Sequence, residues 1–374
     1  MTDQHLQTAL ELAASALFIT SPNPRVGCVL VAADGQVIGQ GHTQRAGGPH
    51  AEIMALRDAA ARGHSTAGAT AYVTLEPCAH QGRTGPCCDA LAAAGVAKVV
   101  GAITDPNPLV AGMGFGRLRA AGVEVVVCAP EDGGDVAREL NIGFFIRMVR
   151  KQPWVRLKAA MSLDGATALA DGSSQWITGE AARADGHHWR ARACAILTGV
   201  GTVLADDPAL DVRYVETPRQ PRLVVLDSQL RTPPQARIFA AEREVLVYTH
   251  SEDSARQAAL QAAGATIVRL PGHASAGPNA RIDLAALMQD LGRREVNELH
   301  VEAGGILNGA LLQAGLVDEC LLYLAPKLLG QGLPAFAGMA LQKLDQAPAL
   351  DIRSIEPLGA DLRVLARLQG HGVF

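Results

Sequence analysis

Apolar residues recur along the first third of the chain at the spacings of helices and buried strands. Residues 6–19 carry apolar side chains at helical spacing, and the Ser-Pro-Asn-Pro run at 21–24 ends that helix. We predict strands at 27–31, 37–39, 70–75 and 98–103, and helices at 51–61 and 87–94. This alternation predicts an α/β fold class, beginning with a three-layer α/β/α domain.

The second half of the chain repeats the alternation. We predict further strands at 155–159, 194–198, 223–226, 244–248, 266–269, 298–302 and 319–324. Between the halves, a helix at 141–150 is closed by Pro153, since proline resists helix and restricts the residue before it. A chain of 374 residues also exceeds what one hydrophobic core usually serves. We therefore expect two domains, covering residues 1–146 and 147–374.

The charge balance limits the class of partner. The formal net charge is −4, so the chain has no excess of positive charge for binding nucleic acid, which depends on Lys and Arg neutralising phosphates. No apolar run reaches the roughly 20 residues of a membrane span, and the first residues lack a signal-peptide pattern. We expect a cytoplasmic protein with a small-molecule substrate and with no nucleic-acid or membrane partner.

Cysteine and histidine supply the first candidate chemistry. The seven cysteines are an odd number in an expected cytoplasmic chain, so metal binding or burial explains them better than a disulfide framework. His50 precedes a predicted helix, Cys78 follows a predicted strand, and Cys87 begins the next helix. One imidazole and two thiolates supply three of zinc's four tetrahedral positions and leave the fourth for water, as in catalytic sites.

Glu52 suits proton transfer at such a site, because it lies two residues beyond His50 without being a ligand. The order His-x-Glu, then Pro-Cys, then Cys is typical of zinc deaminases, although eight residues rather than two separate Cys78 from Cys87. Zinc lowers the pKa of bound water to about 7, which makes hydroxide available for attack on an amino-bearing ring carbon. Glu52 would then return protons to the ring nitrogen and the leaving amine.

Each of these residues has a simpler explanation when taken alone. A histidine at a helix start is usually a cap or a surface group, and a free cysteine is commonly a small buried hydrophobe. A structural zinc site would need a fourth protein ligand, and Cys88 is the obvious candidate for it. We predict Cys87 as the ligand, because neighbouring helical residues point about 100° apart and the helix start favours a thiolate.

Three segments of the first half carry a specific resemblance. The segments PNPRVGCV at 22–29, GGPHAE at 47–52 and TLEPCAHQGRT at 74–84 resemble the deaminase domain of the RibD family of bifunctional riboflavin-biosynthesis proteins. In that family the long loop between the two cysteines is normal. The resemblance implies substrate contacts from Asn23, His80, Arg83 and Thr84, which would otherwise be solvated loop residues.

The second half resembles the reductase domain of the same family, which has a dihydrofolate-reductase-like α/β fold. The resemblance lies in KAAMSLDG at 158–165, SQWIT at 174–178 and TVLADDPAL at 202–210, whereas the glycine turns at 199–201 and 304–305 give only a weak Rossmann signal. It implies contacts with NADPH from Ala160, Trp176, Thr202, Asp206, Ser228, Gly304, Gly305, Ile306, Leu307, Asn308, Gly309 and Ala310. It implies contacts with the substrate from Ser174, Arg190, Leu210, Arg213 and Glu302.

The resemblance implies two consecutive reactions on a phosphoribosylated pyrimidine. Zinc-dependent deamination would convert a diaminopyrimidinone to an aminouracil, and NADPH would then reduce the ribosyl group to ribityl. Lys158 and Asp206 are the candidate proton donors of the reduction.

We expect a homo-oligomer. The alternatives are a nucleotide or nucleic-acid deaminase fused to an unrelated oxidoreductase, and a non-catalytic fusion with a structural zinc site.

Overall fold

The computed structural model describes residues 3–79, 85–108, 110–270 and 281–372. The chain divides into two compact units, Met1–Lys151 and Gln152–Val373. We call them the N-terminal unit and the C-terminal unit. The division follows helix α6 (Ile142–Arg150), whereas the boundary expected near residue 147 falls inside that helix. The helix continues to Arg150, and its end is set by Lys151, which adopts the left-handed backbone conformation.

The N-terminal unit is built on a mixed sheet whose strands lie in the order β2-β1-β3-β4-β5. Strand β1 pairs antiparallel with β2 and β3, while β3, β4 and β5 run parallel. The strands are β1 (Gly27–Val31), β2 (Val37–His42), β3 (Thr70–Val73), β4 (Lys98–Gly101) and β5 (Glu124–Val127). All of the strands predicted in this half are present.

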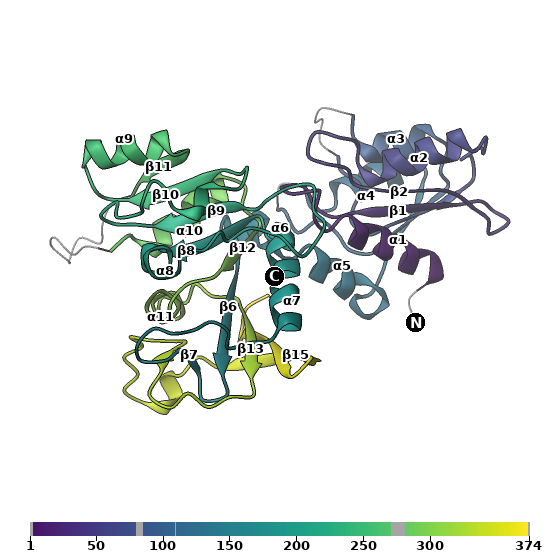
Figure 1. Cartoon of the computed structure of the whole chain (residues 1–374). Helices are drawn as coiled ribbons and strands as arrows, with labels where there is room; N and C mark the ends of the chain where they lie inside the picture. Colours follow the sequence, from purple (N-terminus) through teal and green to yellow (C-terminus); the bar gives the residue numbers. More distant parts are fainter. Residues whose placement is uncertain (1–2, 80–84, 109, 271–280, 373–374) are drawn as a thin grey trace. The chain divides into compact units, whose positions relative to one another are not determined.

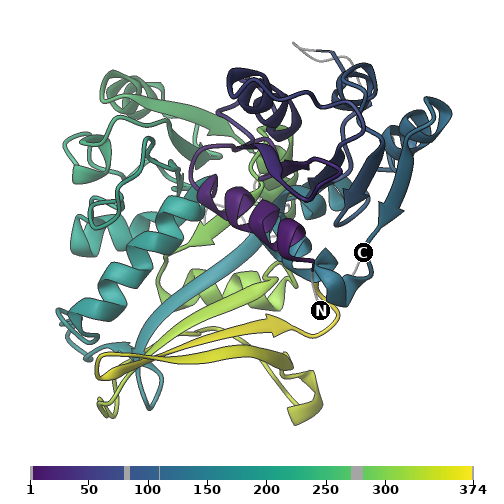
Figure 2. The same ribbon diagram turned by 90° about the vertical axis from the view of Figure 1, so that its right-hand side faces the viewer.

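Helices cover both faces of this sheet, which confirms the predicted three-layer arrangement (Figures 1 and 2). Alternate residues of β1 point to opposite sides: Leu30 packs with the core under α2, and Val29 packs with Ala9 of α1. The helices are α1 (Gln4–Ser15), α2 (Ala51–Ala61), α3 (Cys87–Ala93), α4 (Met113–Ala120) and α5 (Gly134–Leu140), with a short 3₁₀ turn at Pro130–Asp132.

Glycines in β2 allow α2 to lie directly on the sheet. A Cβ atom at Gly39 would stand 2.4 Å from the carbonyl oxygen of Ala55, and one at Gly41 would stand 2.5 Å from Cβ of Met54. Any larger residue at either position would push α2 away from the strand. This contact fixes the helix whose start carries His50 and Glu52.

The C-terminal unit is built on one long sheet, in the order β11-β10-β9-β8-β12-β6-β13-β16-β15. The strands from β11 to β13 in this order are parallel, and the hairpin β15–β16 adds to β13 antiparallel. They are β6 (Trp154–Ser162), β8 (Ala195–Gly199), β9 (Arg222–Leu226), β10 (Val245–Thr249), β11 (Ala265–Arg269), β12 (Glu298–Val301), β13 (Glu319–Ala325), β15 (Leu350–Leu358) and β16 (Asp361–Leu368). A separate small ladder joins β7 (Ala166–Ala168) to β14 (Leu333–Pro334).

Apolar residues on the two faces of this sheet form separate cores with the flanking helices. Leu287 and Leu291 of α10 and Leu311 of α11 pack on one face, and Leu260 of α9 packs on the other. The helices are α7 (Glu180–Arg192), α8 (Val200–Asp206), α9 (Ser254–Ala262), α10 (Leu284–Arg293) and α11 (Gly305–Gln313), with 3₁₀ turns at Arg237–Phe239 and Leu344–Gln346.

Two features of the C-terminal unit differ from the sequence-based expectation. The hairpin β15–β16 was not predicted, because β15 is exposed along most of its length and so lacks a buried alternating face. Helix α11 begins at Gly305, inside the glycine turn that the sequence predicts at 304–305. Glycine is a poor helix former, so the pattern places the start too late.

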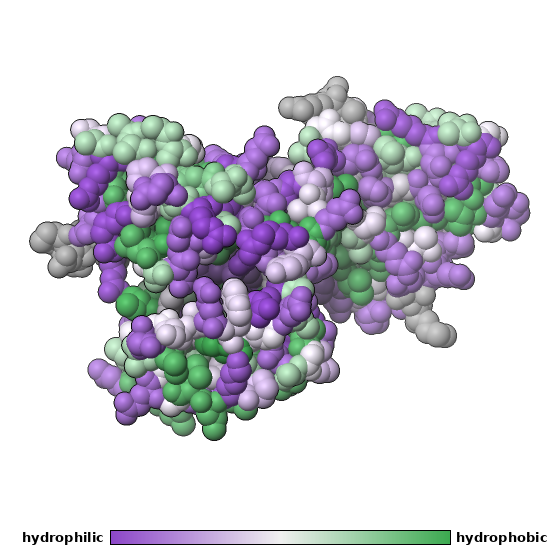
Figure 3. Space-filling model, viewed as in Figure 1, coloured by the Kyte–Doolittle hydropathy of each residue, from purple (hydrophilic) through white to green (hydrophobic). Residues whose placement is uncertain are grey.

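Within the described ranges, no helix is both long and apolar enough to cross a bilayer. On the face shown in Figure 3, each unit presents mostly hydrophilic residues, and smaller hydrophobic areas are scattered among these hydrophilic residues.

Candidate active sites

Three metal-ligating side chains meet in the N-terminal unit. His50 is the N-cap of α2, Cys87 is the first residue of α3, and Cys78 lies in the segment after β3. Nδ1 of His50 lies 3.6 Å from Sγ of Cys78 and 3.4 Å from Sγ of Cys87. All three ligand atoms lie within 4.8 Å of one another. The starts of α2 and α3 and the segment after β3 therefore bring their three ligand atoms close together.

The donor set and its spacing fit a zinc ion. Tetrahedral ligands with Zn–N near 2.0 Å and Zn–S near 2.3 Å lie about 3.5 Å apart, which agrees with the two nitrogen–sulfur distances. His50 makes no side-chain capping hydrogen bond at the start of α2, so capping does not explain its position. Three protein ligands leave one tetrahedral position for water or substrate.

Electrostatics at the cluster favour a thiolate on Cys78. Hydrogen bonds from the Cys87 thiol, from His50 and from the Cys87 backbone lower the pKa of Cys78, although burial opposes this. The pKa of Cys87 is raised because its proton is shared with Cys78 and because its site is buried. Deprotonated sulfur is the form that binds metal.

Cys88 points elsewhere. Its Sγ lies 3.4 Å from Oδ1 of Asp89, its side chain belongs to the hydrophobic core of the N-terminal unit, and it is not part of the metal-ligating cluster. Its backbone N–H donates to the carbonyl oxygen of Cys78 at 3.3 Å. Cys88 therefore contributes to packing and to the position of the Cys78 backbone.

Glu52 lies in the first turn of α2 and is buried. Burial and the nearby Cys78 thiolate raise the pKa of its carboxyl to about 7. A carboxyl with a pKa near neutrality can both accept and return a proton, which is the requirement for a general acid and base.

Glu76 is a residue of this site that the sequence did not single out. Its carboxylate accepts backbone N–H groups from Asp105, Gly112, Gly114 and Phe115, at 2.8–3.3 Å. Two of these donors belong to the first turn of α4, so the carboxylate also stabilises the positive end of that helix. Glu76 therefore ties the start of α4 to the segment that carries Cys78.

Of the four residues of this unit that are predicted to contact the substrate, the structure describes Asn23. Asn23 is half-buried in the loop between α1 and β1, where its backbone N–H donates to the carbonyl of Thr20. His80, Arg83 and Thr84 lie outside the described residues.

In the C-terminal unit, most residues predicted to contact NADPH follow neighbouring parallel strands. Thr202 and Asp206 lie on α8 directly after β8, Ser228 follows β9, and Gly304 is the N-cap of α11 after β12. Because β9, β8 and β12 are adjacent and parallel, these residues share the carboxyl edge of the sheet, where α/β folds usually bind ligands. Ala160 lies within β6, and Trp176 is exposed in the segment before α7.

Part of the predicted NADPH segment has a packing role. A Cβ atom at Gly305 would stand 2.2 Å from the carbonyl oxygen of Pro334, and one at Gly309 would stand 1.9 Å from that of Ala337. Asn308 is buried and donates to the carbonyl of Ala335 at 3.0 Å. These three residues hold α11 against the segment 334–337. Ile306, in contrast, is exposed on the first turn of α11, while Leu307 and Ala310 are half-buried.

A partly buried charge cluster joins two of the predicted substrate residues. Arg190 of α7 donates to both carboxylate oxygens of Glu302, through Nε and through Nη2, and Nζ of Lys158 lies 3.4 Å from the same carboxylate. Burial acts to raise the pKa of Glu302, but Arg190 and Lys158 outweigh it and hold this pKa well below its usual range. Glu302 is therefore a carboxylate at neutral pH. The paired guanidinium of Arg190 has few donors left for a phosphate.

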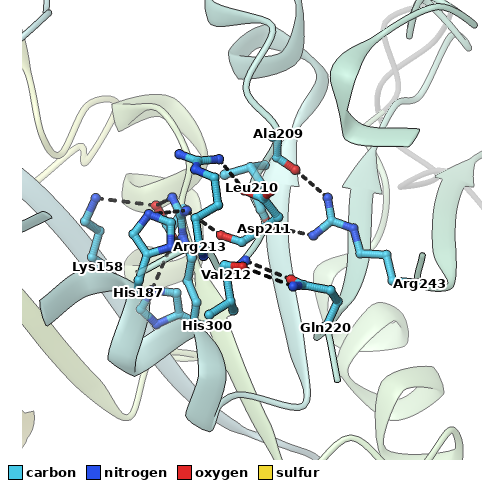
Figure 4. Close-up of polar contacts among 12 residues, drawn as sticks. Lys158, His187, Ala209, Leu210, Asp211, Val212, Arg213, Gln220, Arg243 and His300 are labelled. Carbon is cyan, nitrogen blue, oxygen red and sulfur yellow. Dashed lines mark hydrogen bonds and ion pairs between the residues drawn. The ribbon is translucent and has the colours of Figure 1, made fainter. Parts of the chain in front are cut away.

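Leu210 and Arg213, two further predicted substrate residues, belong to the segment between α8 and β9. The backbone N–H of Arg213 donates to Nδ1 of His187 at 3.1 Å (Figure 4). Burial, together with Arg190 and Arg213, lowers the pKa of His187 to about 4, so this imidazole is neutral and can accept the bond. Ser174, the fifth residue, is half-buried in the segment between β7 and α7.

The comparisons with known proteins cover both units. The model described as "Cytidine and deoxycytidylate deaminase zinc-binding region" matches residues 1–103, which include His50, Cys78 and Cys87. The model described as "RibD C-terminal domain" matches residues 153–364. The second half is therefore not an unrelated oxidoreductase, and the zinc site belongs to a deaminase domain.

Full-length relatives extend the same result. The riboflavin biosynthesis protein RibD of Escherichia coli is 47% identical over 96% of this chain and 97% of its own, and that of Haemophilus influenzae is 44% identical over 96% and 95%. The solved structure of Acinetobacter baumannii RibD has a TM-score of 0.86 at 42% identity and 98% coverage of both chains.

A more distant structure, from Thermotoga maritima, is described as a diaminohydroxyphosphoribosylaminopyrimidine deaminase/5-amino-6-(5-phosphoribosylamino)uracil reductase. It has a TM-score of 0.84 at 32% identity and 97% coverage of both chains. These matches confirm the predicted fold class, a cytidine-deaminase-like domain followed by a dihydrofolate-reductase-like domain. The chain belongs to the RibD family of bifunctional deaminase and reductase enzymes of riboflavin biosynthesis.

Proposed function

We propose that the two units act in sequence on one phosphoribosylated pyrimidine. The N-terminal unit hydrolyses the amino group of the diaminopyrimidinone to give 5-amino-6-(5-phosphoribosylamino)uracil, and the C-terminal unit reduces the ribosyl group of that product to ribityl with NADPH. The observation that carries the proposal is the buried Glu52 beside the cluster of His50, Cys78 and Cys87. The matches to both halves of bifunctional relatives support it.

In the deaminase step, His50, Cys78 and Cys87 would hold the zinc ion. The bound metal supplies an acidified water at neutral pH. Glu52 would accept one proton from that water and pass it to the ring nitrogen, and would then pass the second proton, from the added hydroxyl group, to the leaving amine, so that ammonia departs as a neutral molecule. Its burial and its raised pKa support both directions of transfer.

In the reductase step, the protein orients the substrate against the nicotinamide of NADPH, which supplies the hydride. Two hydrogen bonds between Arg190 and Glu302 fix the orientation of both side chains. Arg190 also donates to the carbonyl of Asp211, which places the segment that contains Leu210 and Arg213 beside this pair. Lys158 is better placed than Asp206 to donate a proton. It is half-buried beside Glu302, whereas Asp206 is exposed at the end of α8.

We extend the proposal to the cellular location, the oligomeric state and the partners of the enzyme. We place it in the cytoplasm, as a homo-oligomer that acts on a small molecule and has no nucleic-acid or membrane partner. None of its seven cysteines, which all lie in the described part of the chain, forms a disulfide, and this fits a reducing compartment. Its net charge of −4 disfavours binding to nucleic acid. Light scattering on the purified protein measures the oligomeric state directly.

Ammonia release with three substrates tests the proposed deaminase specificity. The diaminopyrimidine phosphoriboside should release ammonia, while cytidine and single-stranded DNA should not. Release from cytidine or DNA at a comparable rate would overturn the proposed substrate class.

A further inference from the structure

The segment at residues 209–213 of the C-terminal unit depends on side chains from elsewhere for its conformation. Leu210 has a φ of 49°, which lies in the left-handed region that a branched, non-glycine residue rarely adopts. Its side chain is buried in the core between β9, β10 and α9. A residue in this conformation persists only where the surrounding structure holds it.

Arg243, just before β10, holds this turn. One terminal nitrogen of its guanidinium, Nη1, donates to the carbonyl of Leu210, and the other, Nη2, donates to the carbonyl of Ala209 (Figure 4). Nη2 also donates to the carbonyl of Ile238. Three backbone carbonyls from two separate segments thus meet at one planar group, which fixes their relative positions.

No carboxylate in the described part of the chain forms an ion pair with Arg243, so carbonyl oxygens provide its polar environment. Burial lowers the pKa of Arg243 to about 10, and the side chain remains charged at neutral pH. Its Nε is buried and has no hydrogen-bond partner among the described residues. A partly buried cation of this kind loses hydration, and the bonds to the turn offset that cost.

The rest of the segment is held by side chains that lie outside residues 209–213. Nη1 of Arg190 donates to the carbonyl of Asp211 at 2.9 Å. Gln220 binds both backbone groups of Val212, accepting from its N–H and donating to its carbonyl. Every residue from 209 to 213 therefore has at least one backbone group bound by a side chain, since His187 binds that of Arg213.

We propose that Arg243 is a positioning residue of the reductase, which holds the turn at Ala209 and Leu210 so that Leu210 and Arg213 stay in register with Arg190 at the substrate site. The inference rests on the proposed reductase function. Arg243 itself is assigned no contact with substrate or cofactor. Its loss should affect substrate binding more than NADPH binding, because the segment carries predicted substrate residues and not the cofactor residues of α11.

Two substitutions and one control test this role in the full-length enzyme. Arg243→Met keeps the length and volume of the side chain but removes every donor, and Arg243→Lys keeps the charge and part of the donor set. Arg269→Met is the control, since the side chain of Arg269 forms an exposed ion pair with Glu252 at the edge strand β11. Ammonia release by the N-terminal unit of each variant reports on the quality of the same preparation.

Reductase kinetics with pre-deaminated substrate give the first readout. Arg243→Met should raise the KM for the pyrimidine by about tenfold or more, with a smaller change in kcat, because a misplaced binding segment weakens substrate binding. NADPH affinity and ammonia release should stay unchanged, and Arg243→Lys should recover part of the KM. An unchanged KM in Arg243→Met, or an equal loss of NADPH affinity, would overturn the inference.

Hydrogen–deuterium exchange gives a second readout that does not depend on activity. Peptides that cover residues 209–213 should exchange faster in Arg243→Met than in the parent protein, and Arg269→Met should not change them. Unchanged exchange in Arg243→Met would contradict the role of Arg243 even if the parent enzyme reduced no pyrimidine. An inactive parent enzyme would instead contradict the proposed function.

Discussion

The backbone N–H of Cys87 donates a hydrogen bond to Sγ of Cys78 at 3.3 Å. This bond joins the start of α3 to the segment after β3, and it orients one cysteine sulfur through the backbone of the other. An N–H bond of this kind stabilises a metal-bound thiolate and fixes its direction. The two cysteines therefore act as one unit, and their neighbour Cys88 belongs to the core.

Substitution of the two adjacent cysteines distinguishes their roles. Cys87→Ala should lose most of the zinc and the deaminase activity, because it removes one of three ligands. Cys88→Ala should keep both, with a modest loss of stability from the core. Elemental analysis and ammonia release measure the outcome, and the reverse pattern would show that Cys88 is the ligand.

Glu52→Gln should abolish ammonia release and leave zinc bound, since the amide keeps the size of the side chain but cannot transfer protons. The same protein should still reduce pre-deaminated substrate with NADPH, because Glu52 belongs to the N-terminal unit. Undiminished deamination would remove the role of Glu52. Loss of both activities in a folded protein would argue for one shared site.

Glu76→Gln should destabilise the N-terminal unit by about 1–3 kcal/mol and reduce deaminase activity, because an amide cannot accept four N–H groups and brings a donor into their midst. Urea unfolding measures the free energy of unfolding. Glu131→Gln, at an exposed carboxylate of the same unit, is the matched control. Equal stability of the two variants would contradict the anchoring role of Glu76.

The stability of the C-terminal unit should fall at acid pH. The pKa of Glu302 is well below its usual range in the folded protein, so its contribution to stability is complete above the unfolded value of about 4.3 and is lost as the pH falls toward the folded value. Glu319, paired with the buried Arg156, acts in the same direction.

Urea unfolding of this unit at pH 7 and at pH 3, followed through tryptophan fluorescence, measures the effect. Glu302→Gln should show a weaker loss of stability between the two pH values, because one of the titrating carboxylates is gone. A parent protein that is equally stable at both values would contradict this electrostatic account.

The sequence predicted the metal cluster because its residue types stand at helix starts and strand ends, where the local pattern fixes their positions. It also predicted the parallel strands, since their apolar runs are nearly continuous. It missed the hairpin β15–β16, whose first strand is mostly exposed. Local patterns identify buried elements, and this hairpin has too little buried surface to be recognised.

The contacts of Glu76 and Arg243 could not be predicted for a different reason. Both side chains bind backbone groups, and backbone groups leave no residue-specific signal in a sequence. Glu76 reaches donors that lie 29–39 residues away, and Arg243 reaches carbonyls 33 and 34 residues away. Only the folded chain brings these groups together.

The most direct test of the central claim is the mass of the products formed from the diaminopyrimidine phosphoriboside. Without NADPH, the purified enzyme should give a single product in which one amino group is replaced by oxygen. With NADPH, that product should gain two hydrogen atoms, and the order of the two changes should be fixed. A reduced product that retains both amino groups, or no change in mass under either condition, would contradict the account.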